Sequence, residues 1–247
     1  MRRVMIIISR FEPNPNGVAI VVCELVKNMR AHGLCVKRAY LEDLVYMDVT
    51  IKNKYAKKIA YFLTNDFDVK KYYYRLEDAG WTIINSGGLK KEYTKFAMQS
   101  ALQKNSIKVP HSFVKLVRNN WKFPLYIKSY RQLSYVVCAK NVQDVKNAKK
   151  IFNCQKEKYY FENAVDERKM LLHKVYYVKG KTLCCGTYQI SDKVMNDISR
   201  ILELDIFSVD MFISHNGDYR VIDINPAPAL YRSVKMRDAF SQYLCAL

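Results

Sequence analysis

The sequence predicts an α/β protein in which an open α/β lobe is followed by lobes of mixed α+β structure. The first observation is an apolar run within residues 3–9, which is typical of a strand buried on both faces. The second is helical apolar spacing over 18–31 between that run and another strand at 35–41, which makes a β-loop-α-β unit. The third is a pair of alternating strands within 208–224, joined by the hairpin signal Asn216-Gly217.

Composition limits the kind of molecule without naming its task. The chain has 247 residues, half of them apolar, which is enough for one large domain or for two or three small lobes. The formal net charge of +18 favours acidic partners such as nucleotides, polyphosphates, nucleic acid, acidic peptides or an anionic membrane. A lysine-rich surface in contact with water explains the same charge, so the charge does not choose among these partners.

The cysteines indicate a reducing compartment, and the N-terminus lacks the apolar core of a signal peptide. Seven cysteines are an odd number and no C-x-x-C pair exists, so the spacing of a zinc site is missing. Four of them lie in apolar runs and are expected to be buried: Cys23, Cys138, Cys184 and Cys185. The apolar run 4–8 is too short for a signal peptide, and no stretch approaches the ~20 apolar residues of a membrane span. We therefore expect a soluble, cytoplasmic protein with no membrane partner.

The chain as a whole is predicted to have three parts. Alternating strand and helix patterns continue to residue 85, and the turn Ser86-Gly87-Gly88 marks the end of an N-terminal α/β lobe, 1–88. A central part, 89–160, and a C-terminal part, 161–247, each mix helices with strands. Within them we expect helices over 89–105, 142–152, 192–202 and 232–244, and strands over 109–116, 123–128, 132–140, 159–165, 170–178 and 181–190.

The hairpin near the C-terminus gathers oxygen-bearing side chains. Asp210 lies near one outer end and Asp223 near the other, and Asn225 follows two positions later, on the same face of an extended strand. Apolar neighbours place Asp223 at the edge of a core, where an unpaired carboxylate is costly and a hard cation relieves the cost. Carboxylate and amide oxygens suit Mg²⁺, so the hairpin predicts a magnesium site. An ordinary hairpin with polar ends is the alternative.

This motif resembles the C-terminal metal motif of ATP-grasp enzymes, an Asp followed about a dozen positions on by an acid, then by Asn and a Pro-containing loop, here Pro226-Ala-Pro228. D-alanine–D-alanine ligase, glutathione synthetase, the ribosomal-protein glutamate ligase and the inositol trisphosphate kinases carry versions of it. The resemblance implies the ATP-grasp fold, in which an open α/β lobe precedes two α+β subdomains that clasp a nucleotide. It also implies ATP with Mg²⁺, or with Mn²⁺ in its place, and Asp210, Asp223 and Asn225 as the metal ligands.

Other segments follow in the order that the family shows. Tyr93-Thr-Lys95, Pro124-Leu-Tyr-Ile-Lys128 and His173-Lys174 resemble the segments whose lysines contact the nucleotide phosphates. Residues 159–165 resemble the hinge whose backbone contacts the adenine edge. The resemblance thus implies that ATP is bound by Lys95, Lys128 and Lys174 and by the backbone of Glu162, Asn163 and Ala164, with Asp166 or Glu167 near the ribose. A solvated helix lysine and an edge-strand lysine are the alternatives for Lys95 and Lys128.

Two departures from the family concern the phosphates and the second substrate. Many members have a Gly-rich loop after the second lysine, whereas residues 129–134 contain no glycine, so Ser129, Tyr130 or Arg131 would replace that loop. Many ligases place an Arg two positions before the first metal Asp, where this chain has Ser208. The candidates for binding a substrate carboxylate or phosphate, and hence for a catalytic role, are Arg232, Arg220 and Arg131.

The resemblance implies a carboxylate–amine ligase that forms a peptide-type C–N bond through an acyl phosphate and releases ADP and phosphate. Such chemistry needs no side-chain nucleophile. The expected partners are ATP, a small acidic substrate such as an amino acid or a peptide carboxylate, and an amine. Asp223 and the net charge support a second hypothesis, a kinase of the inositol-phosphate type. The missing glycine loop and the basic surface support a third, a non-catalytic binding protein of this fold. A homo-oligomer is left open, and nucleic acid is not favoured.

Overall fold

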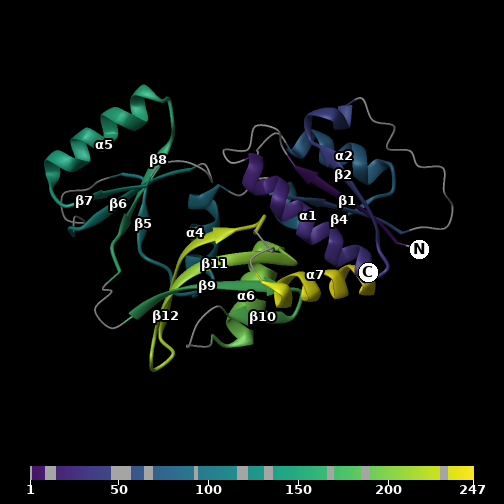
Figure 1. Cartoon of the computed structure of the whole chain (residues 1–247). Helices are drawn as coiled ribbons and strands as arrows, with labels where there is room; N and C mark the ends of the chain where they lie inside the picture. Colours follow the sequence, from purple (N-terminus) through teal and green to yellow (C-terminus); the bar gives the residue numbers. More distant parts are fainter. Residues whose placement is uncertain are drawn as a thin grey trace.

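The computed structural model of the protein describes residues 2–8, 15–45, 57–63, 69–91, 94–115, 122–130, 136–165, 170–184, 190–228 and 233–247. These residues form three four-stranded sheets, which we name A, B and C. Their strand orders are β2-β1-β3-β4, β5-β8-β6-β7 and β10-β9-β11-β12 respectively. Figure 1 shows that each sheet lies in a different part of the molecule.

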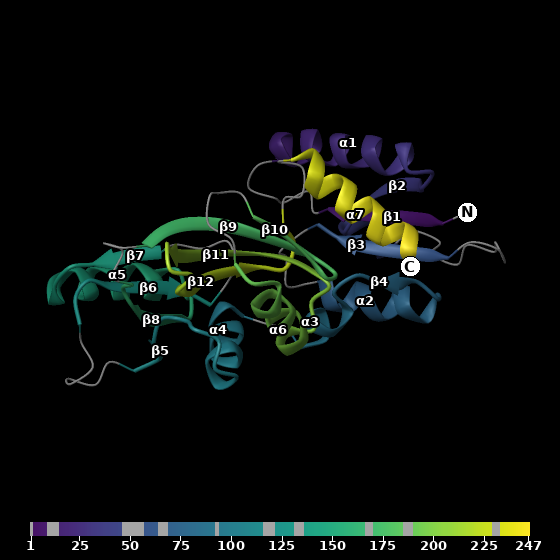
Figure 2. The ribbon, with the colours of Figure 1, turned by 90° about the horizontal axis from the view of Figure 1, so that it is seen from below.

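Sheet A is parallel and opens the chain. It consists of β1 (Arg3–Ile8), β2 (Cys35–Tyr40), β3 (Lys58–Phe62) and β4 (Thr82–Ile83), with the short 3-10 helix η1 (Glu42–Val45) after β2. Helix α1 (Pro15–Ala31) lies on one face and α2 (Val69–Asp78) on the other (Figure 2). Because both faces are covered, β1 is buried along almost its whole length, as its apolar run predicted.

The boundary after sheet A differs from the predicted turn. Residues Ser86–Lys90 form a short helix, α3, and α4 (Lys95–Lys104) starts after the N-cap Thr94, so the helix expected from residue 89 is two helices. The glycines allow close packing here, because a Cβ atom at Gly87 would lie 2.4 Å from Glu203 Oε2. The same atom at Gly88 would lie 2.4 Å from Leu204 Cδ2. The glycines thus serve a tertiary contact rather than a turn.

Sheet B is antiparallel, and among the described residues one helix covers one of its faces. Its strands are β5 (Ser112–Phe113), β6 (Leu125–Ser129), β7 (Val136–Ala139) and β8 (Tyr159–Asn163), and the helix is α5 (Val142–Cys154). The apolar side of α5 packs on β6 and β8 to form a separate small core, which includes Leu125, Ile127, Phe152 and Phe161. Because side chains alternate along a strand, Lys128 and Glu162 lie on the opposite face.

Sheet C is antiparallel and contains the predicted C-terminal hairpin. Its strands are β9 (Met170–Val178), β10 (Lys181–Cys184), β11 (Ile206–Ser214) and β12 (Tyr219–Asn225). Helices α4 and α6 (Asp192–Leu202) cover the face that carries Phe207, Val209 and Met211. The other face carries Asp210.

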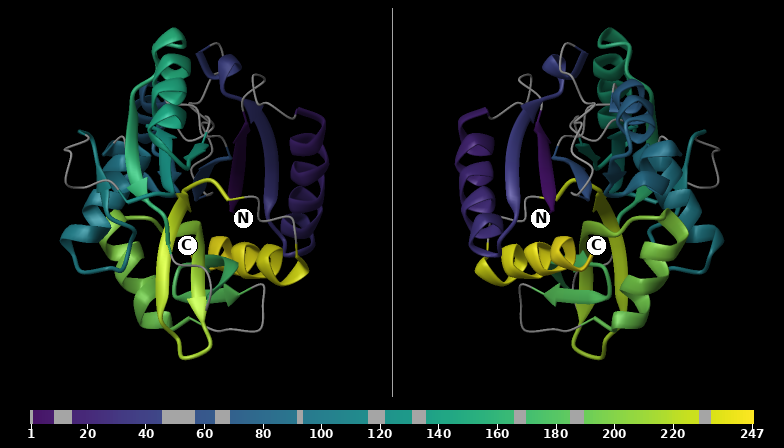
Figure 3. Two further views of the ribbon diagram at one scale, coloured as in Figure 1. Left: turned by 90° about the vertical axis from the view of Figure 1, so that its left-hand side faces the viewer. Right: turned by 90° about the vertical axis from the view of Figure 1, so that its right-hand side faces the viewer.

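Sheets A and C share one core, to which the C-terminal helix contributes. Helix α7 (Val234–Ala246) lies between α1 and the β9–β10 hairpin (Figure 3). Its Phe240 packs on Tyr61 of β3, with ring centroids 4.8 Å apart. Tyr176 and Ile206 of sheet C belong to the same apolar cluster. The division at residues 88 and 160 stays a prediction, and β8 continues past residue 160.

Two of the cysteines predicted to be buried are exposed. Cys23 lies on the outer side of α1, and Cys138 lies on β7, an edge strand of sheet B. Their apolar neighbours misled the prediction because neighbouring residues point in different directions around a helix and to opposite faces of a strand. The side chain of Cys184 and the whole of Cys185 lie outside the described residues. Among the described helices, none combines the length and the apolar composition that crossing a bilayer requires.

Asn85 joins sheet A to sheet C. Its backbone has a φ of 62°, a left-handed conformation that Asn adopts more readily than most residues. Its side-chain oxygen accepts hydrogen bonds from the N–H groups of Asp205 and Ile206, at 2.8 and 2.9 Å. Its side-chain nitrogen donates to the carbonyl groups of Ile206 and Pro226, at 2.6 and 2.8 Å. One buried side chain thus positions the start of β11 and the loop after β12 together.

We predict that Asn85→Ala lowers the free energy of unfolding by about 2–4 kcal/mol, because partly or fully buried backbone groups lose their partners and the left-handed backbone disfavours alanine. Urea denaturation measures this change. The matched control is Asn105→Ala, since the Asn105 side chain donates only an exposed bond to the Ala101 carbonyl, at 2.9 Å. That variant should differ from wild type by less than about 0.5 kcal/mol. Equal losses in the two variants would contradict the prediction.

Candidate active site

A β-bulge in the β11–β12 hairpin determines which side chains meet. From the turn outward the pairs are Ile213 with Tyr219, Phe212 with Arg220 and Met211 with Val221. The register then shifts, and Asp210 pairs with Asp223 rather than with Ile222. Without the extra residue, Asp223 would lie opposite Val209, against the apolar core under α4 and α6. The bulge at Ile222 therefore turns Asp223 to the face that carries Asp210.

The three predicted metal ligands lie on this one face. Asp210 and Asp223 are direct cross-strand partners. Asn225, two residues beyond Asp223 and so the next on the same face, pairs with Ser208. Both carboxylates are about a third exposed, and Asn225 Oδ1 accepts a hydrogen bond from the Ala227 N–H at 2.9 Å. In the described residues no three His, Cys, Asp or Glu side chains cluster as metal ligands. Two carboxylates and one amide oxygen nevertheless fit Mg²⁺, which takes few protein ligands and completes its shell with water and phosphate.

Two of the predicted lysines pair with these carboxylates. Lys174 of β9 is the cross-strand neighbour of Asp210, and its Nζ lies 2.7 Å from Asp210 Oδ1. Lys95, the first residue of α4, is mostly buried, and its Nζ lies 3.2 Å from Asp223 Oδ2. Lys95 is therefore not a solvated surface lysine, which was the alternative for this residue. The protein thus holds cations and anions in contact on one partly open face.

Lys128 connects sheet B to the bulge. It forms a buried ion pair with Glu162 of the neighbouring strand β8. Its Nζ also donates to the carbonyl of Ile222, at 2.9 Å. Burial raises the pKa of Glu162, and the Lys128 ammonium acts against this rise. Lys128 therefore spans the two sheets, which rules out the alternative of an exposed edge-strand lysine.

The predicted hinge lines a pocket of about 780 Å³. Asn163, Ala164 and Val165 form one side of it, and Met170, Ser214 and Arg220 contribute to the rest. The N–H groups of Asn163 and Ala164 donate within the chain, to His111 at 3.1 Å and to Pro124 at 3.3 Å. Backbone contacts from these two residues to a base would therefore use their carbonyl groups. Glu162 faces Lys128 with its side chain.

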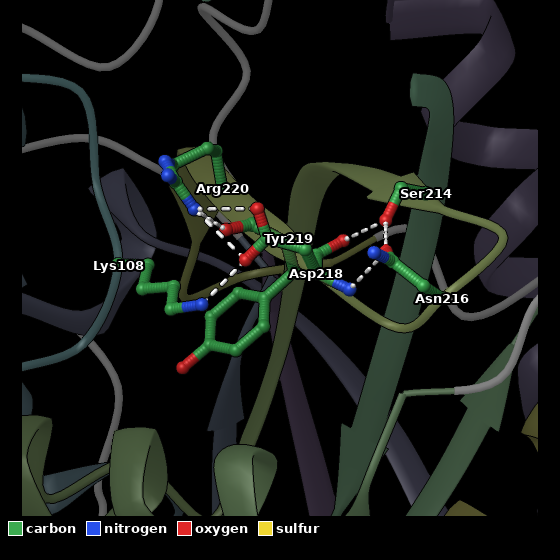
Figure 4. A network of polar contacts seen from close by, with 6 residues as sticks. All are labelled: Lys108, Ser214, Asn216, Asp218, Tyr219 and Arg220. Atoms are coloured by element: carbon green, nitrogen blue, oxygen red, sulfur yellow. Dashed lines mark hydrogen bonds and ion pairs between the residues drawn. The ribbon is translucent and has the colours of Figure 1, made fainter. Parts of the chain in front are cut away.

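The predicted substrate arginines are only partly placed. Arg220 lies on the face of Asp210, nearer the hairpin turn, and its Nη1 lies 3.2 Å from Asp218 Oδ1 (Figure 4). Lys108 also binds Asp218, and this contact is the main reason that the pKa of Asp218 is lowered. Arg131 and Arg232 lie outside the described residues, as do the proposed ribose contacts Asp166 and Glu167.

An aromatic group beside the lysines was not predicted from the sequence. Phe96 of α4 packs against Tyr130 and Tyr160, with ring centroids 5.4 and 5.3 Å apart. The N–H of Lys95 donates to the Tyr130 carbonyl at 3.1 Å, which ties the start of α4 to sheet B. Tyr160 alternates with Phe161 along β8, so the alternation of that strand was the available signal.

Comparison with known proteins places this geometry in a known fold. No protein-family model and none of the curated proteins matches the sequence. A D-alanine–D-alanine ligase from Bacillus anthracis is similar in structure, with a TM-score of 0.75, 13% identity and coverage of 99% of this chain and 95% of the other. A RimK domain ATP-grasp protein from Sphaerobacter thermophilus has a TM-score of 0.71 at 12% identity, over 98% and 99% of the two chains. The macrocyclase MdnC from Microcystis aeruginosa, bound with its precursor peptide, has a TM-score of 0.68 at 11% identity over the whole of both chains. The chain therefore has the ATP-grasp fold, as its motifs predicted.

We predict that Lys128→Met lowers stability in a pH-dependent way. Removing the ammonium raises the folded-state pKa of Glu162 further above its ordinary value of 4.5. A raised folded-state pKa gives stability that is full below pH 4.5 and is lost as the pH rises through the folded value. At neutral pH the loss should reach about 3–5 kcal/mol, the range for breaking a buried pair, and it should shrink toward pH 4.5.

Urea denaturation across this pH range measures the effect. The control is the double variant Lys128→Met with Glu162→Gln, which has no carboxylate left to titrate at this position. Its own free energy of unfolding should therefore change much less with pH than that of the single variant. A pH-independent loss in the single variant would show that Glu162 does not depend on Lys128.

Proposed function

We propose that the protein is an ATP- and Mg²⁺-dependent ligase that joins a carboxylate to an amine through an acyl phosphate. The observation that carries the proposal is a pair of ion pairs on the partly open face of sheet C. Lys95 pairs with Asp223, and Lys174 pairs with Asp210. Lys128 of sheet B contacts the same hairpin at the Ile222 carbonyl. Three ammonium groups and two carboxylates in one place suit a magnesium–triphosphate complex, because both charges of that complex find partners.

The proposed binding exchanges the partners seen in the structure. Asp210, Asp223 and Asn225 would hold the metal ion, and Lys95 and Lys174 would then turn from their carboxylates to phosphate oxygens. Lys128 would add a third positive charge while it stays beside Glu162. The carbonyl groups of the hinge at Glu162, Asn163 and Ala164 would accept from the base in the pocket that Asn163 and Ala164 line. Arg220, Arg131 and Arg232 are the proposed partners of the second substrate.

The proposed reaction has two steps, phosphoryl transfer to the substrate carboxylate and attack by the amine. ATP supplies the γ-phosphoryl group, which a substrate carboxylate oxygen takes up as the bond to ADP breaks. The amine then attacks the acyl carbon, the C–N bond forms, phosphate leaves, and the amine's proton passes to solvent. The three lysines would neutralise the phosphates throughout. Positioning and charge stabilisation of this kind supply most of the catalysis in phosphoryl transfer.

The relatives in structure support this choice of chemistry. The D-alanine–D-alanine ligase has also been crystallised with ATP, and the ligase PsnB with a precursor peptide variant, Mg and ADP. Both names denote ligation rather than the transfer of phosphate to an alcohol. We therefore place the ligase above the small-molecule kinase for this chain.

We predict that Mg²⁺ and ATP bind in a strongly coupled manner. Mg²⁺ alone would leave the lysines without phosphate partners, and ATP alone would place its phosphates beside the unneutralised carboxylates. In calorimetry the affinity for ATP should rise roughly 5–150-fold when Mg²⁺ is present, the usual size of coupling between two sites. Asp223→Asn should remove most of this rise. The control is Asp197→Asn on α6, where the carboxylate only pairs with Arg200 on the surface. An Asp223→Asn variant that keeps the full coupling would refute the metal site.

We also predict turnover of ATP that requires two further substrates. Purified protein with ATP and Mg²⁺ should release ADP when a panel supplies both an amino acid or peptide carboxylate and an amine. Mass spectrometry should then find a product lighter than its two components by one water. ADP release that requires only a polyol phosphate would identify a kinase instead. Nucleotide binding without any turnover would indicate a non-catalytic protein.

A further inference from the structure

The positive charge of the chain is concentrated in its central part. Residues 89–160 contain sixteen Lys and Arg against three Asp and Glu, which is +13 of the total +18. Residues 161–247 contain eleven of each and are neutral. Residues 1–88 contain fourteen against nine. The proposed nucleotide site uses only Lys95 and Lys128 of the central group, so most of this charge serves another purpose or none.

Much of the remaining charge surrounds α5. Lys146 and Lys150 lie on the helix, Lys140 just before it, and Lys156 and Lys158 just after it, and all five are exposed. We call these five lysines the α5 basic face. Helix α5 lies at the outer end of the molecule, on the side of sheet B opposite Lys128 and Glu162 (Figures 1 and 2). The α5 basic face is therefore separate from the proposed active site.

The charges of this face are not neutralised within the described parts of the chain. None of the ion pairs found there involves any of the five lysines. The nearby Asp144 carboxylate accepts a hydrogen bond from the backbone N–H of Lys140 at 2.8 Å and does not pair with a lysine side chain. Lys146 and Lys150 are four positions apart on the helix, where like charges repel and weaken it. The face is thus kept basic at a cost to the helix.

We propose that the α5 basic face binds an acidic polypeptide segment. Val142 and Ile151 lie exposed on the same helix, with 44% and 46% of their surface accessible. These two side chains can pack against apolar residues that lie between the acidic residues of a polypeptide. The phosphate backbone of a nucleic acid has no apolar group to pack against them. The aromatic residue of α5, Phe152, is buried, so the helix offers no surface on which a base can stack.

The chemistry of the cations points the same way. Residues 136–165 contain six lysines in and around α5 and no arginine. Arginine is the side chain that grips phosphate with two parallel hydrogen bonds, whereas lysine acts as a mobile point charge. A row of point charges beside apolar groups suits carboxylates spaced along a flexible chain. This proposal does not depend on the ligase activity, because the binding needs neither ATP nor a reaction.

The test measures binding of a fluorescent peptide in which Glu alternates with apolar residues, by anisotropy with the full-length protein and no nucleotide. Lys146→Gln, Lys150→Gln and Lys156→Gln together should weaken binding about tenfold, the combined effect of three exposed ion pairs. The matched control replaces Lys37, Lys104 and Lys193 by Gln, which removes equal charge from exposed positions on other elements. It should change binding less than about twofold. Equal losses in both triple variants would mean that net charge alone acts and would overturn the proposal.

Two further probes separate polypeptide from nucleic acid. Val142→Ser with Ile151→Ser should weaken binding of the Glu peptide and leave that of a single-stranded RNA of equal charge unchanged. A peptide with Gln in place of Glu should not bind. If the RNA binds more tightly than the Glu peptide at the same salt concentration, the face is a nucleic-acid surface and the proposal fails. Thermal unfolding of every variant confirms that the fold is intact.

Discussion

The bulge at Ile222 is the constraint on which the site depends. In a regular hairpin Asp210 would stay on its partly open face of sheet C and Asp223 would point into the apolar core, because side chains alternate on a strand. One extra residue in β12 turns Asp223 to the face of Asp210. The same extra residue presents the Ile222 carbonyl to Lys128. A single local irregularity thus creates both the pair of acids and the contact that connects two sheets.

The described contacts of sheet B with the rest of the molecule include polar and aromatic groups, whereas sheets A and C share an apolar core. Among these groups are Lys128, Lys95 and the rings of Phe96, Tyr130 and Tyr160. Two of these groups, Lys95 and Lys128, are proposed to bind the nucleotide, so a ligand bound there would also strengthen the attachment of sheet B. Stability and ligand binding are therefore linked through the same contacts.

The ion pairs of the site stabilise its charged side chains before a ligand binds. Lys95 and Lys174 each hold a carboxylate that the proposal assigns to a metal ion. Such pairs remove the cost of leaving either charge alone on a partly buried surface. The two carboxylates can still exchange a lysine for a metal ion, because each is about a third exposed and is already partly solvated. The arrangement keeps a strongly charged site stable before any ligand arrives.

Most of the order of strands and helices, the hairpin and the types of residue on its face follow from the sequence, whereas η1 and the separate helix α3 were not predicted. The predicted features follow from apolar spacing and turn chemistry, which act over a few neighbouring residues. The tertiary structure alone decided that Gly87 and Gly88 pack against the end of α6, that Asn85 holds β11, and that Lys128 reaches the bulge. Each of these joins residues distant in the chain, and their meeting depends on how whole sheets and helices pack. Local pattern contains no information about such contacts.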